Sequence, residues 1–276
     1  MSTSTQSKFK TLNCHPKHKR KNTKKKYTCY DDNTLVMFKN LWNKKFHDNK
    51  IKATSVMDIW NELKKKIPSC TDEQCWSDKL KVKTNSFSPK SPKDWKTNKW
   101  LSNIDIKSVL QQYKEAYSNF DYLGPTPIDF DRKLGSGCVK DEICKLSIAE
   151  KIKKKINKIG ISINLDVHGG YGLHWVTLFI DLEKKFIFYF DSCGDPIPKE
   201  IKALMDRVEE QCKKLGIKMT QHDSRHMRHQ MSETECGMYS LYCIINLLEG
   251  KHSINYFKTH KIPDHDIERY RRIYFN

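Results

Sequence analysis

The sequence predicts a core of mixed helices and strands, α/β or α+β, preceded by a small helical domain. Apolar residues recur at helical spacing between residues 32 and 67, and helix-like and strand-like patterns alternate from about residue 94 onward. Two adjacent runs, LHWVTLFID and FIFYFDS, are strongly β-prone. At 276 residues, 37% of them hydrophobic, the chain can bury one substantial core plus an appendage.

Composition divides the chain into three parts. Residues 1–27 hold nine Lys and Arg and no Asp or Glu, with few apolar residues, so we predict a basic disordered arm. This arm is either a solubilising tail or a segment for nucleic-acid binding or localisation. Residues 28–90 form a helical N-terminal domain that ends in a polar linker, and residues 91–276 form the main domain.

The helical domain is predicted from its apolar stripes. In TSVMDIWNELKKKI the apolar residues fall on one helix face, with Thr54 or Ser55 as N-cap. An earlier stripe suggests a partner helix. The two stripes are Val56, Ile59, Trp60, Leu63 and Ile67, and Leu35, Phe38, Trp42 and Phe46.

Charge and cysteine content indicate the setting. The chain has 51 Lys and Arg against 33 Asp and Glu, a formal charge of +18, which favours encounters with nucleic acid, acidic proteins or anionic lipid. We expect no membrane span and no secretory signal, because no run of about 18 apolar residues occurs and the first residues lack an apolar segment. Ten cysteines without a secretory route predict free thiols in a reducing, intracellular location.

The two β-prone runs predict a hairpin that pairs a histidine with an aspartate. If Leu182 and Lys185 close the hairpin, Asp191 lies opposite Val176 and diagonal to His174 on the same face. The carboxylate would then hold one imidazole nitrogen as a donor and leave the other as a base. Alternatively, the two residues are a surface histidine and a turn aspartate at the open end of the hairpin.

Cys236 lies where a polar loop meets a buried helix. The residues that follow it are apolar on nearly all sides, and the helix is predicted to end at Gly250. Unpaired N–H groups and the positive end of the helix dipole favour a negatively charged sulfur at this position. Gly237 has no Cβ to block an approaching substrate backbone. Gln230, six residues before the cysteine, could donate to a carbonyl oxygen under attack, together with the Cys236 N–H.

Taken together, these residues resemble a known family. The order His174-Trp175, Asp191, Gln230 and Cys236-Gly237 is similar to that of the cysteine proteases related to ubiquitin-like-protein-specific proteases and the adenovirus protease. WLSNIDI, residues 100–106, resembles the W-L-N-D-x-x-I helix start of that family. Within the family, RHQMSETECGMYS resembles the polyprotein-processing proteases of large cytoplasmic DNA viruses, of the African swine fever virus type. The likeness extends over about residues 95–250.

The resemblance implies the fold and the roles of individual residues. It implies a papain-like α+β core, with a central mixed sheet flanked by helices. Cys236 would be the nucleophile, His174 the general base and then acid, Asp191 its orienter and Gln230 an oxyanion donor. Substrates of such proteases are cut after small residues, typically after Gly-Gly or Ala-Gly, and Trp175 would form a wall of the tunnel to the thiol. Trp175 and Gly237 are therefore the predicted substrate-binding residues.

The predicted function is that of a viral cysteine endopeptidase, which matures structural polyproteins in the host cytoplasm and the virion. Deconjugation of ubiquitin-like modifiers is the second enzyme hypothesis, and a basic nucleic-acid-binding module on an inactive protease fold is the third. Expected partners are a polypeptide substrate and nucleic acid at the basic arm, with no membrane. The oligomeric state stays open. No cofactor is expected.

Other conspicuous residues have simpler interpretations. His222, His226 and His229 have helical ligand spacing but lie among arginines without a helix signal, so we predict no metal. Cys70 and Cys75 are expected to be thiols packed beside Trp76. FDYLGPTPIDFD, residues 120–131, is interpreted as a rigid loop and strand entry, with a wall of a substrate cleft as the alternative.

Overall fold

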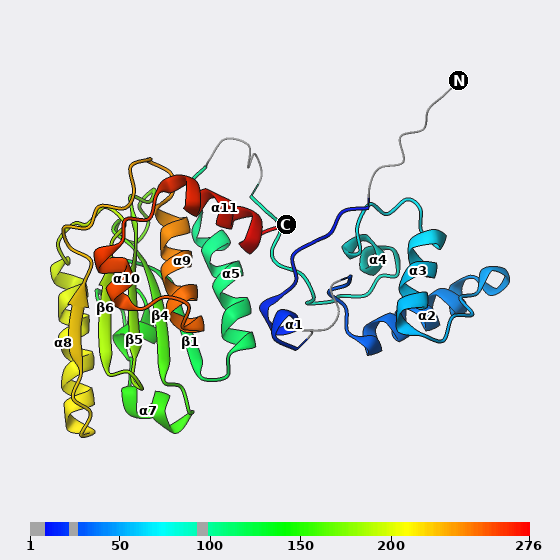
Figure 1. The fold of residues 1–276 in the computed structure, drawn as a ribbon. Coiled ribbons are helices and arrows are strands. Elements are labelled where there is room, and N and C mark those ends of the chain that lie inside the picture. The colour runs from blue at the N-terminus through cyan, green and yellow to red at the C-terminus, as the bar shows by residue number, and fades with distance from the viewer. Residues whose placement is uncertain (1–8, 22–26, 93–98) are drawn as a thin grey trace. The chain divides into compact units, whose positions relative to one another are not determined.

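The computed structural model describes residues 9–21, 27–92 and 99–276. The chain consists of two compact units, one of residues 1–88 with Asn276 and one of residues 89–275. The units are described separately (Figure 1). Over the described ranges, no helix has the length and apolar character needed to cross a membrane.

The first unit is helical, as predicted from the apolar stripes. Asp31 caps α2 by accepting from the Thr34 N–H, and Ser55 caps α3 by accepting from the Asp58 N–H. The caps and stripes are local features, which explains why the sequence predicted both helices. The helices of this unit are α1 Pro16–Lys21, α2 Asp32–Lys45, the 3-10 helix η1 His47–Asn49, α3 Val56–Lys66 and α4 Gln74–Lys79.

Two segments predicted to lie outside a packed domain belong to this unit. Within the predicted disordered arm, residues 9–21 contain α1, and Lys10 and Cys14 form isolated bridges to Asp72 and Phe87. Within the predicted linker, residues 77–88 include buried Phe87. Both predictions are therefore wrong for these residues. Although the two segments are polar in sequence, contacts with distant residues give them a defined structure. Residues 1–8 and 22–26 of the predicted arm, and residues 93–98 at the start of the predicted main domain, lie outside the described residues.

Six cysteines are paired, which contradicts the prediction of free thiols. The disulfides are Cys14–Cys29, Cys70–Cys75 and Cys138–Cys144, and the free cysteines are Cys193, Cys212, Cys236 and Cys243. Irregular spacing concealed the pairs because only the tertiary fold determines which Cα atoms come within bridging distance. The argument from free thiols for a reducing location therefore loses its basis.

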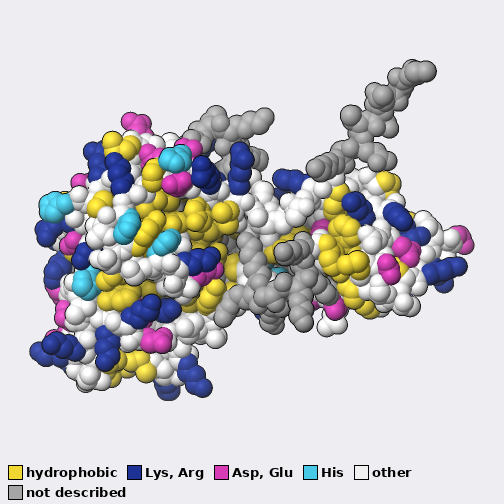
Figure 2. Space-filling model, in the orientation of Figure 1, with side chains coloured by type: hydrophobic (Ala, Val, Ile, Leu, Met, Phe, Trp, Pro, Cys, Tyr) yellow, Lys and Arg dark blue, Asp and Glu magenta, His cyan; other side chains and the backbone are white. Residues whose placement is uncertain are grey.

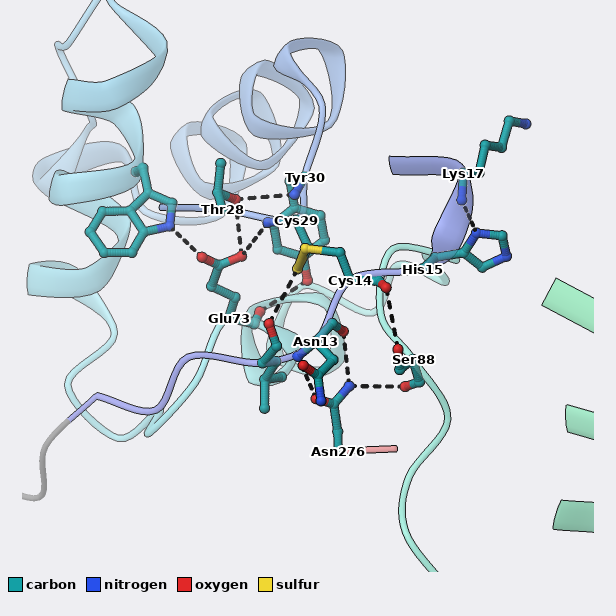
Figure 3. Close-up of a disulfide and its surroundings, with 12 residues drawn as sticks. Asn13, Cys14, His15, Lys17, Thr28, Cys29, Tyr30, Glu73, Ser88 and Asn276 are labelled. Carbon is teal, nitrogen blue, oxygen red and sulfur yellow. Dashed lines mark hydrogen bonds between the residues drawn. A yellow bond between two sulfur atoms is a disulfide. The ribbon is translucent and has the colours of Figure 1, made fainter. Parts of the chain in front are cut away.

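Figure 3 shows the Cys14–Cys29 disulfide beside a buried carboxylate. Glu73 accepts hydrogen bonds from the Thr28 hydroxyl, the Cys29 N–H and the Trp60 indole, at 2.9, 3.2 and 2.8 Å. Burial nevertheless raises the pKa of Glu73, against the effect of these donors. This network joins α3 and α4 to the segment before α2.

The second unit contains a five-stranded mixed sheet in the order β1-β4-β5-β6-β7. The pairs β1–β4 and β6–β7 are parallel, and β4–β5 and β5–β6 are antiparallel. In the β5–β6 hairpin, Asp181 pairs with Phe186 and Thr177 with Phe190, which is the predicted register. The strands are β1 Phe120–Pro127, β4 Lys158–Asn164, β5 Trp175–Asp181, β6 Phe186–Phe190 and β7 Thr220–Asp223, with a separate hairpin of β2 Lys133–Leu134 and β3 Gly137–Cys138.

Helices cover the sheet and form two cores. Alternate residues of β5 enter different cores: Trp175 and Phe179 pack with α5 and α9, whereas Val176 and Leu178 pack with α8. Figure 1 shows α5 and α9 in front of the sheet. The helices of this unit are α5 Asn103–Ala116, α6 Asp141–Cys144, α7 Ile148–Lys153, α8 Lys199–Lys214, α9 Cys236–Glu249, α10 Ile254–Thr259 and α11 Asp264–Tyr274.

Three helices of this unit follow the sequence signals closely. A capping box between Ser102 and Asp105 starts α5 at the WLSNIDI segment. Helix α8 carries its apolar residues on one face and buries Cys212 in the core. Helix α9 is buried along nearly its whole length and ends at Gly250, whose φ of 68° is the left-handed cap that glycine favours.

Candidate active site

The structure brings His174 and Asp191 together at the end of the β5–β6 hairpin. His174 directly precedes β5 and Asp191 directly follows β6, so the observed register leaves them side by side. The His174 Nε2 atom donates to Asp191 Oδ1 at 2.7 Å. The predicted pairing is therefore confirmed, and the alternative of two unrelated surface residues is wrong.

Asp191 is held rigidly by groups that the sequence did not reveal. Its side chain is fully buried, and its Oδ1 also accepts from the Cys193 N–H at 2.8 Å. The Ser224 hydroxyl accepts from the Asp191 N–H at 3.0 Å and reaches the Asp191 carbonyl at 3.2 Å. Ser224 follows β7, whose parallel pairing with β6 is a long-range contact without a local sequence signal.

The imidazole has an environment that favours its protonated form. Burial lowers the pKa of His174, but the hydrogen bond to Asp191 and the interactions with the Cys193 and Cys236 thiols outweigh this effect and raise it to about 12. A positively charged ring beside a thiol stabilises the thiolate, the nucleophilic form of cysteine. The site can therefore hold an imidazolium ring beside the Cys236 sulfur.

Cys236 is the first residue of α9, as predicted, and interacts with the His174 ring. It is 2% exposed. The first N–H groups of a helix have no partner within the helix and carry partial positive charge. The sulfur thus lies between the start of a buried helix and a cationic ring, and three of the four predicted catalytic residues lie together.

Gln230, the fourth predicted residue, is buried and oriented by Ser192. The Ser192 hydroxyl donates to Gln230 Oε1 at 2.7 Å, and the Ser192 carbonyl accepts from the Gln230 N–H at 2.9 Å. The amide oxygen is therefore occupied, and the NH₂ group is the donating end. One N–H of this group donates a hydrogen bond to the Ser232 carbonyl at 2.6 Å. Ser192 follows Asp191 directly, so one turn contacts both Gln230 and His174.

Two residues of α11 hold the loop between Gln230 and Cys236. Asp264 accepts from the N–H groups of Met231 and Ser232 at 3.0 and 2.8 Å. Arg271 donates to both carboxylate oxygens of Glu235 at 3.0 and 2.6 Å. Sequence reasoning missed Asp264 and Arg271, because charged residues on an amphipathic helix ordinarily face solvent.

Trp175, which directly follows His174 in the sequence, lines a cavity. Its indole is 8% exposed and donates to the Leu101 carbonyl at 3.0 Å. The cavity has a volume of about 430 Å³ and includes Trp100 and Pro125. The other residues that line it are Ser102, Asn103, Thr126, Pro127, Asn164 and residues 166–170 with Tyr171 and Gly172. The GPTP segment thus forms part of a strand and also a cavity wall.

Gly237 lacks a Cβ for a reason other than the predicted one. A Cβ at this position would lie 2.9 Å from the Leu101 Cβ, so Leu101 fills the space that was assigned to a substrate backbone. The steric part of that prediction is wrong, because the start of α5 packs against α9 there. Contact of Gly237 with substrate stays a prediction.

The three histidines weighed as metal ligands do not form a ligand group among the described residues. His222 lies on strand β7 rather than on a helix. His229 is buried, where its Nε2 contacts the Phe257 carbonyl at 2.9 Å and its Nδ1 accepts from the Ile262 N–H at 3.2 Å. His229 is therefore a core residue.

A mixed sheet that presents a histidine–aspartate pair to a cysteine at a helix start defines a papain-like cysteine protease site. The Ulp1 protease family model, C-terminal catalytic domain, matches residues 131–276. The chain therefore belongs to the Ulp1 protease family, and the predicted resemblance and fold class are confirmed.

Individual relatives are proteins of large DNA viruses. Over 180 residues the chain is 31% identical to the SUMO-1 cysteine protease of African swine fever virus (isolate Tick/South Africa/Pretoriuskop Pr4/1996), across 62% of this chain and 66% of the relative. It is 28% identical to a protein of Acanthamoeba polyphaga mimivirus that is named as a thiol protease, across 65% and 58%. These matches span less than two thirds of either relative.

A solved structure shares the fold over nearly the whole chain. The crystal structure of an African swine fever virus protease matches with a TM-score of 0.67 at 22% identity, covering 96% of this chain and 95% of that chain. At this identity the likeness supports the fold.

Proposed function

We propose that this chain is a viral cysteine endopeptidase that cleaves polypeptides after small residues. The observation that carries the proposal is the hydrogen bond between His174 and Asp191, on the same imidazole that interacts with Cys236 at the start of α9. This arrangement supplies a nucleophile, a proton carrier and an orienting carboxylate. Family membership favours the same chemistry.

The reaction follows from these groups. The Cys236 thiolate attacks the scissile carbonyl carbon, and the Gln230 NH₂ and Cys236 N–H groups donate to the oxyanion. His174 gives its proton to the leaving amine as the carbon–nitrogen bond breaks, leaving a thioester. Neutral His174 then takes a proton from water, which hydrolyses the thioester and restores the thiol.

The substrate proposal is a structural polyprotein cut at Gly-Gly-X-like sites during virion maturation. The cavity beside Trp175 supports an extended peptide, because tryptophan and proline side chains provide a rigid apolar edge. A buried Cys236 supports small residues next to the cut, since a bulky side chain could not pass to the sulfur. We also place the enzyme in the host cytoplasm and the virion, a proposal that rests on the viral relatives.

The test compares two substrates that contain the same Gly-Gly sequence. One is a viral core polyprotein and the other is a fusion of a ubiquitin-like modifier. We expect faster cleavage of the polyprotein, with new N-termini after Gly-Gly identified by mass spectrometry. Cys236→Ala and His174→Ala are expected to abolish cleavage while retaining the fold. Full turnover by Cys236→Ala protein would disprove the mechanism.

Removal of a ubiquitin-like modifier is the alternative enzyme function. The name of the African swine fever virus relative, SUMO-1 cysteine protease, favours it. The same catalytic groups would act on a Gly-Gly tail. Preference for the modifier fusion in the comparison above would make deconjugation the main function.

Nucleic-acid binding by the first unit is a second candidate function. Residues 1–88 carry 20 Lys and Arg against eight Asp and Glu, so this third of the chain has +12 of the formal charge of +18. Figure 2 shows Lys and Arg side chains on the visible face of this unit beside hydrophobic ones. The exposed lysines on and around its helices include Lys44, Lys45, Lys50, Lys52, Lys64, Lys65, Lys79, Lys81 and Lys83.

Salt dependence tests this second candidate. Lysines that neutralise DNA phosphates release counterions. The logarithm of the affinity for duplex DNA should therefore fall linearly with the logarithm of the salt concentration. Changing Lys64 and Lys65 to Glu should weaken binding and flatten the slope. Affinity independent of salt would contradict the candidate. The Cys236→Ala protein should bind equally well, because no step of catalysis is involved.

A further inference from the structure

Three potential metal ligands surround one point of the candidate active site. His174, Asp191 and Cys193 each offer a ligand atom, and these atoms all lie within 4.8 Å of one another. No second group of this kind exists in the part of the chain that the structure describes. Cys193 forms and breaks no bond in the proposed reaction, and its thiol interacts with the His174 ring.

The turn after β6 builds this cluster. The Cys193 N–H donates to Asp191 Oδ1, which places cysteine and carboxylate side by side. Asp191 is fully buried, and its Oδ2 makes no hydrogen bond of normal geometry among the residues described, although the buried Tyr189 hydroxyl interacts with this carboxylate. A buried carboxylate oxygen that lacks a close donor is suited to a cation. The His174 side chain is 19% exposed and the free Cys193 thiol is partly exposed, so an ion can reach them.

We propose that a zinc ion binds His174, Asp191 and Cys193 and blocks the protease while it is bound. Imidazole, carboxylate and thiolate are zinc ligands, whereas Mg²⁺ and Ca²⁺ prefer oxygen alone. Tetrahedral zinc holds its ligand atoms about 3.5 Å apart, so the His174 and Asp191 atoms, which are 2.7 Å apart, must separate slightly and the other atoms must approach. The Cys193 thiol and the His174 Nε2–H group release their protons to solvent when the metal binds. A water molecule takes the fourth position, because Cys236 is not part of this cluster.

Zinc binding and catalysis exclude each other at this site. Zinc between His174 and Asp191 displaces the proton that His174 donates to Asp191. Its positive charge beside the ring disfavours the imidazolium form, which must give a proton to the leaving amine. The blocking effect rests on the proposed protease function, whereas binding of the metal does not. The two parts therefore need separate measurements.

Binding is measured without activity, in the full-length Cys236→Ala protein. Cadmium serves as the probe, because a cadmium–thiolate bond absorbs in the ultraviolet. We expect saturable absorption in Cys236→Ala and its loss in Cys193→Ala/Cys236→Ala. Cys212→Ala/Cys236→Ala is the matched control and should keep the signal, since Cys212 is a free thiol buried under α8. No cadmium–thiolate signal in Cys236→Ala would overturn the site, whether or not the wild type is active.

Blocking is measured by titrating peptide cleavage with zinc. Cys193→Ala removes a direct ligand and should weaken zinc inhibition at least about tenfold. Removing even a residue that only hydrogen-bonds to a metal ligand typically lowers metal affinity by that factor. Cleavage without zinc should persist in this variant, and a chelator should restore zinc-treated wild type. Equal zinc sensitivity of wild type and Cys193→Ala would overturn the assignment. An inactive wild type that still gives the cadmium signal would disprove the protease function and leave the metal site.

Discussion

Arg271, in the last helix of the chain, forms a buried two-point ion pair with Glu235, the residue directly before Cys236. The two side chains are 3% and 0% exposed, and the shorter contact is 2.6 Å. Arg271 also donates to the Lys99 carbonyl at 3.1 Å. The position of the nucleophile thus depends on a residue 36 positions beyond Glu235 in the chain.

Breaking this pair should damage stability and activity together. Arg271→Met leaves the Glu235 carboxylate buried without its cation, which typically costs about 3–5 kcal/mol. Urea unfolding should report this loss, and kcat should fall because residue 236 is displaced. Arg269→Met on the same helix is the control: Arg269 is exposed and its pair with Asp266 is worth about 1 kcal/mol or less. Equal stability of the two variants would show that the buried pair contributes nothing specific.

The raised pKa of His174 predicts a shifted pH profile in Asp191→Asn. Asp191 stabilises the imidazolium, so replacing its negative charge lowers the pKa of His174 from about 12 towards 6.5. The alkaline limb of kcat/KM should therefore move to lower pH. Profiles of wild type and variant on one peptide substrate measure this shift. An unchanged alkaline limb would mean that Asp191 orients the ring without stabilising its charge.

The same pKa sets a stability window. The pKa of His174 is higher in the folded chain than the ordinary value of 6.5. Protonation of His174 therefore contributes fully to the free energy of unfolding below pH 6.5, and this contribution declines as pH rises towards about 12. In His174→Ala, the destabilisation relative to wild type should be greater at pH 6 than at pH 10, as measured by urea unfolding. A difference that grows with pH would contradict this sign.

Ser192→Ala should impair the oxyanion donor without removing it. Loss of the hydroxyl that holds Gln230 Oε1 frees the amide to rotate, so we expect a smaller fall in kcat than in Gln230→Ala. Removing an oxyanion donor outright typically costs about 10²–10³ in kcat. The double variant should be no worse than Gln230→Ala, because Ser192 acts through the amide. Additive losses would assign Ser192 a separate role.

Gly237→Ala should destabilise the start of α9. In an open helix this change would stabilise by about 1 kcal/mol, but here the new Cβ meets the Leu101 Cβ at 2.9 Å. Overpacking of this kind costs about 1–3 kcal/mol. Displacing Leu101 also disturbs the carbonyl that accepts from Trp175, so KM should rise. Urea unfolding and steady-state kinetics measure the two effects. An unchanged free energy of unfolding and an unchanged KM would show that Leu101 can move away from residue 237 without cost.

The sequence by itself determined the features that depend on neighbours along the chain. Hairpin length set the register that joins His174 to Asp191, and apolar periodicity placed Cys236 at the start of a buried helix. Capping residues started α3 and α5. These signals are local because backbone geometry repeats within a few residues.

Only the tertiary structure decided which distant groups support the site. The contacts of Arg271 with Glu235, Ser192 with Gln230 and Leu101 with Gly237 cross loops and helices whose packing has no sequence period. The disulfides arose in the same way, from Cα atoms that the fold brings within bonding distance. Periodicity shows which face of an element is apolar, whereas the partner of that face is set by the packing of the whole domain.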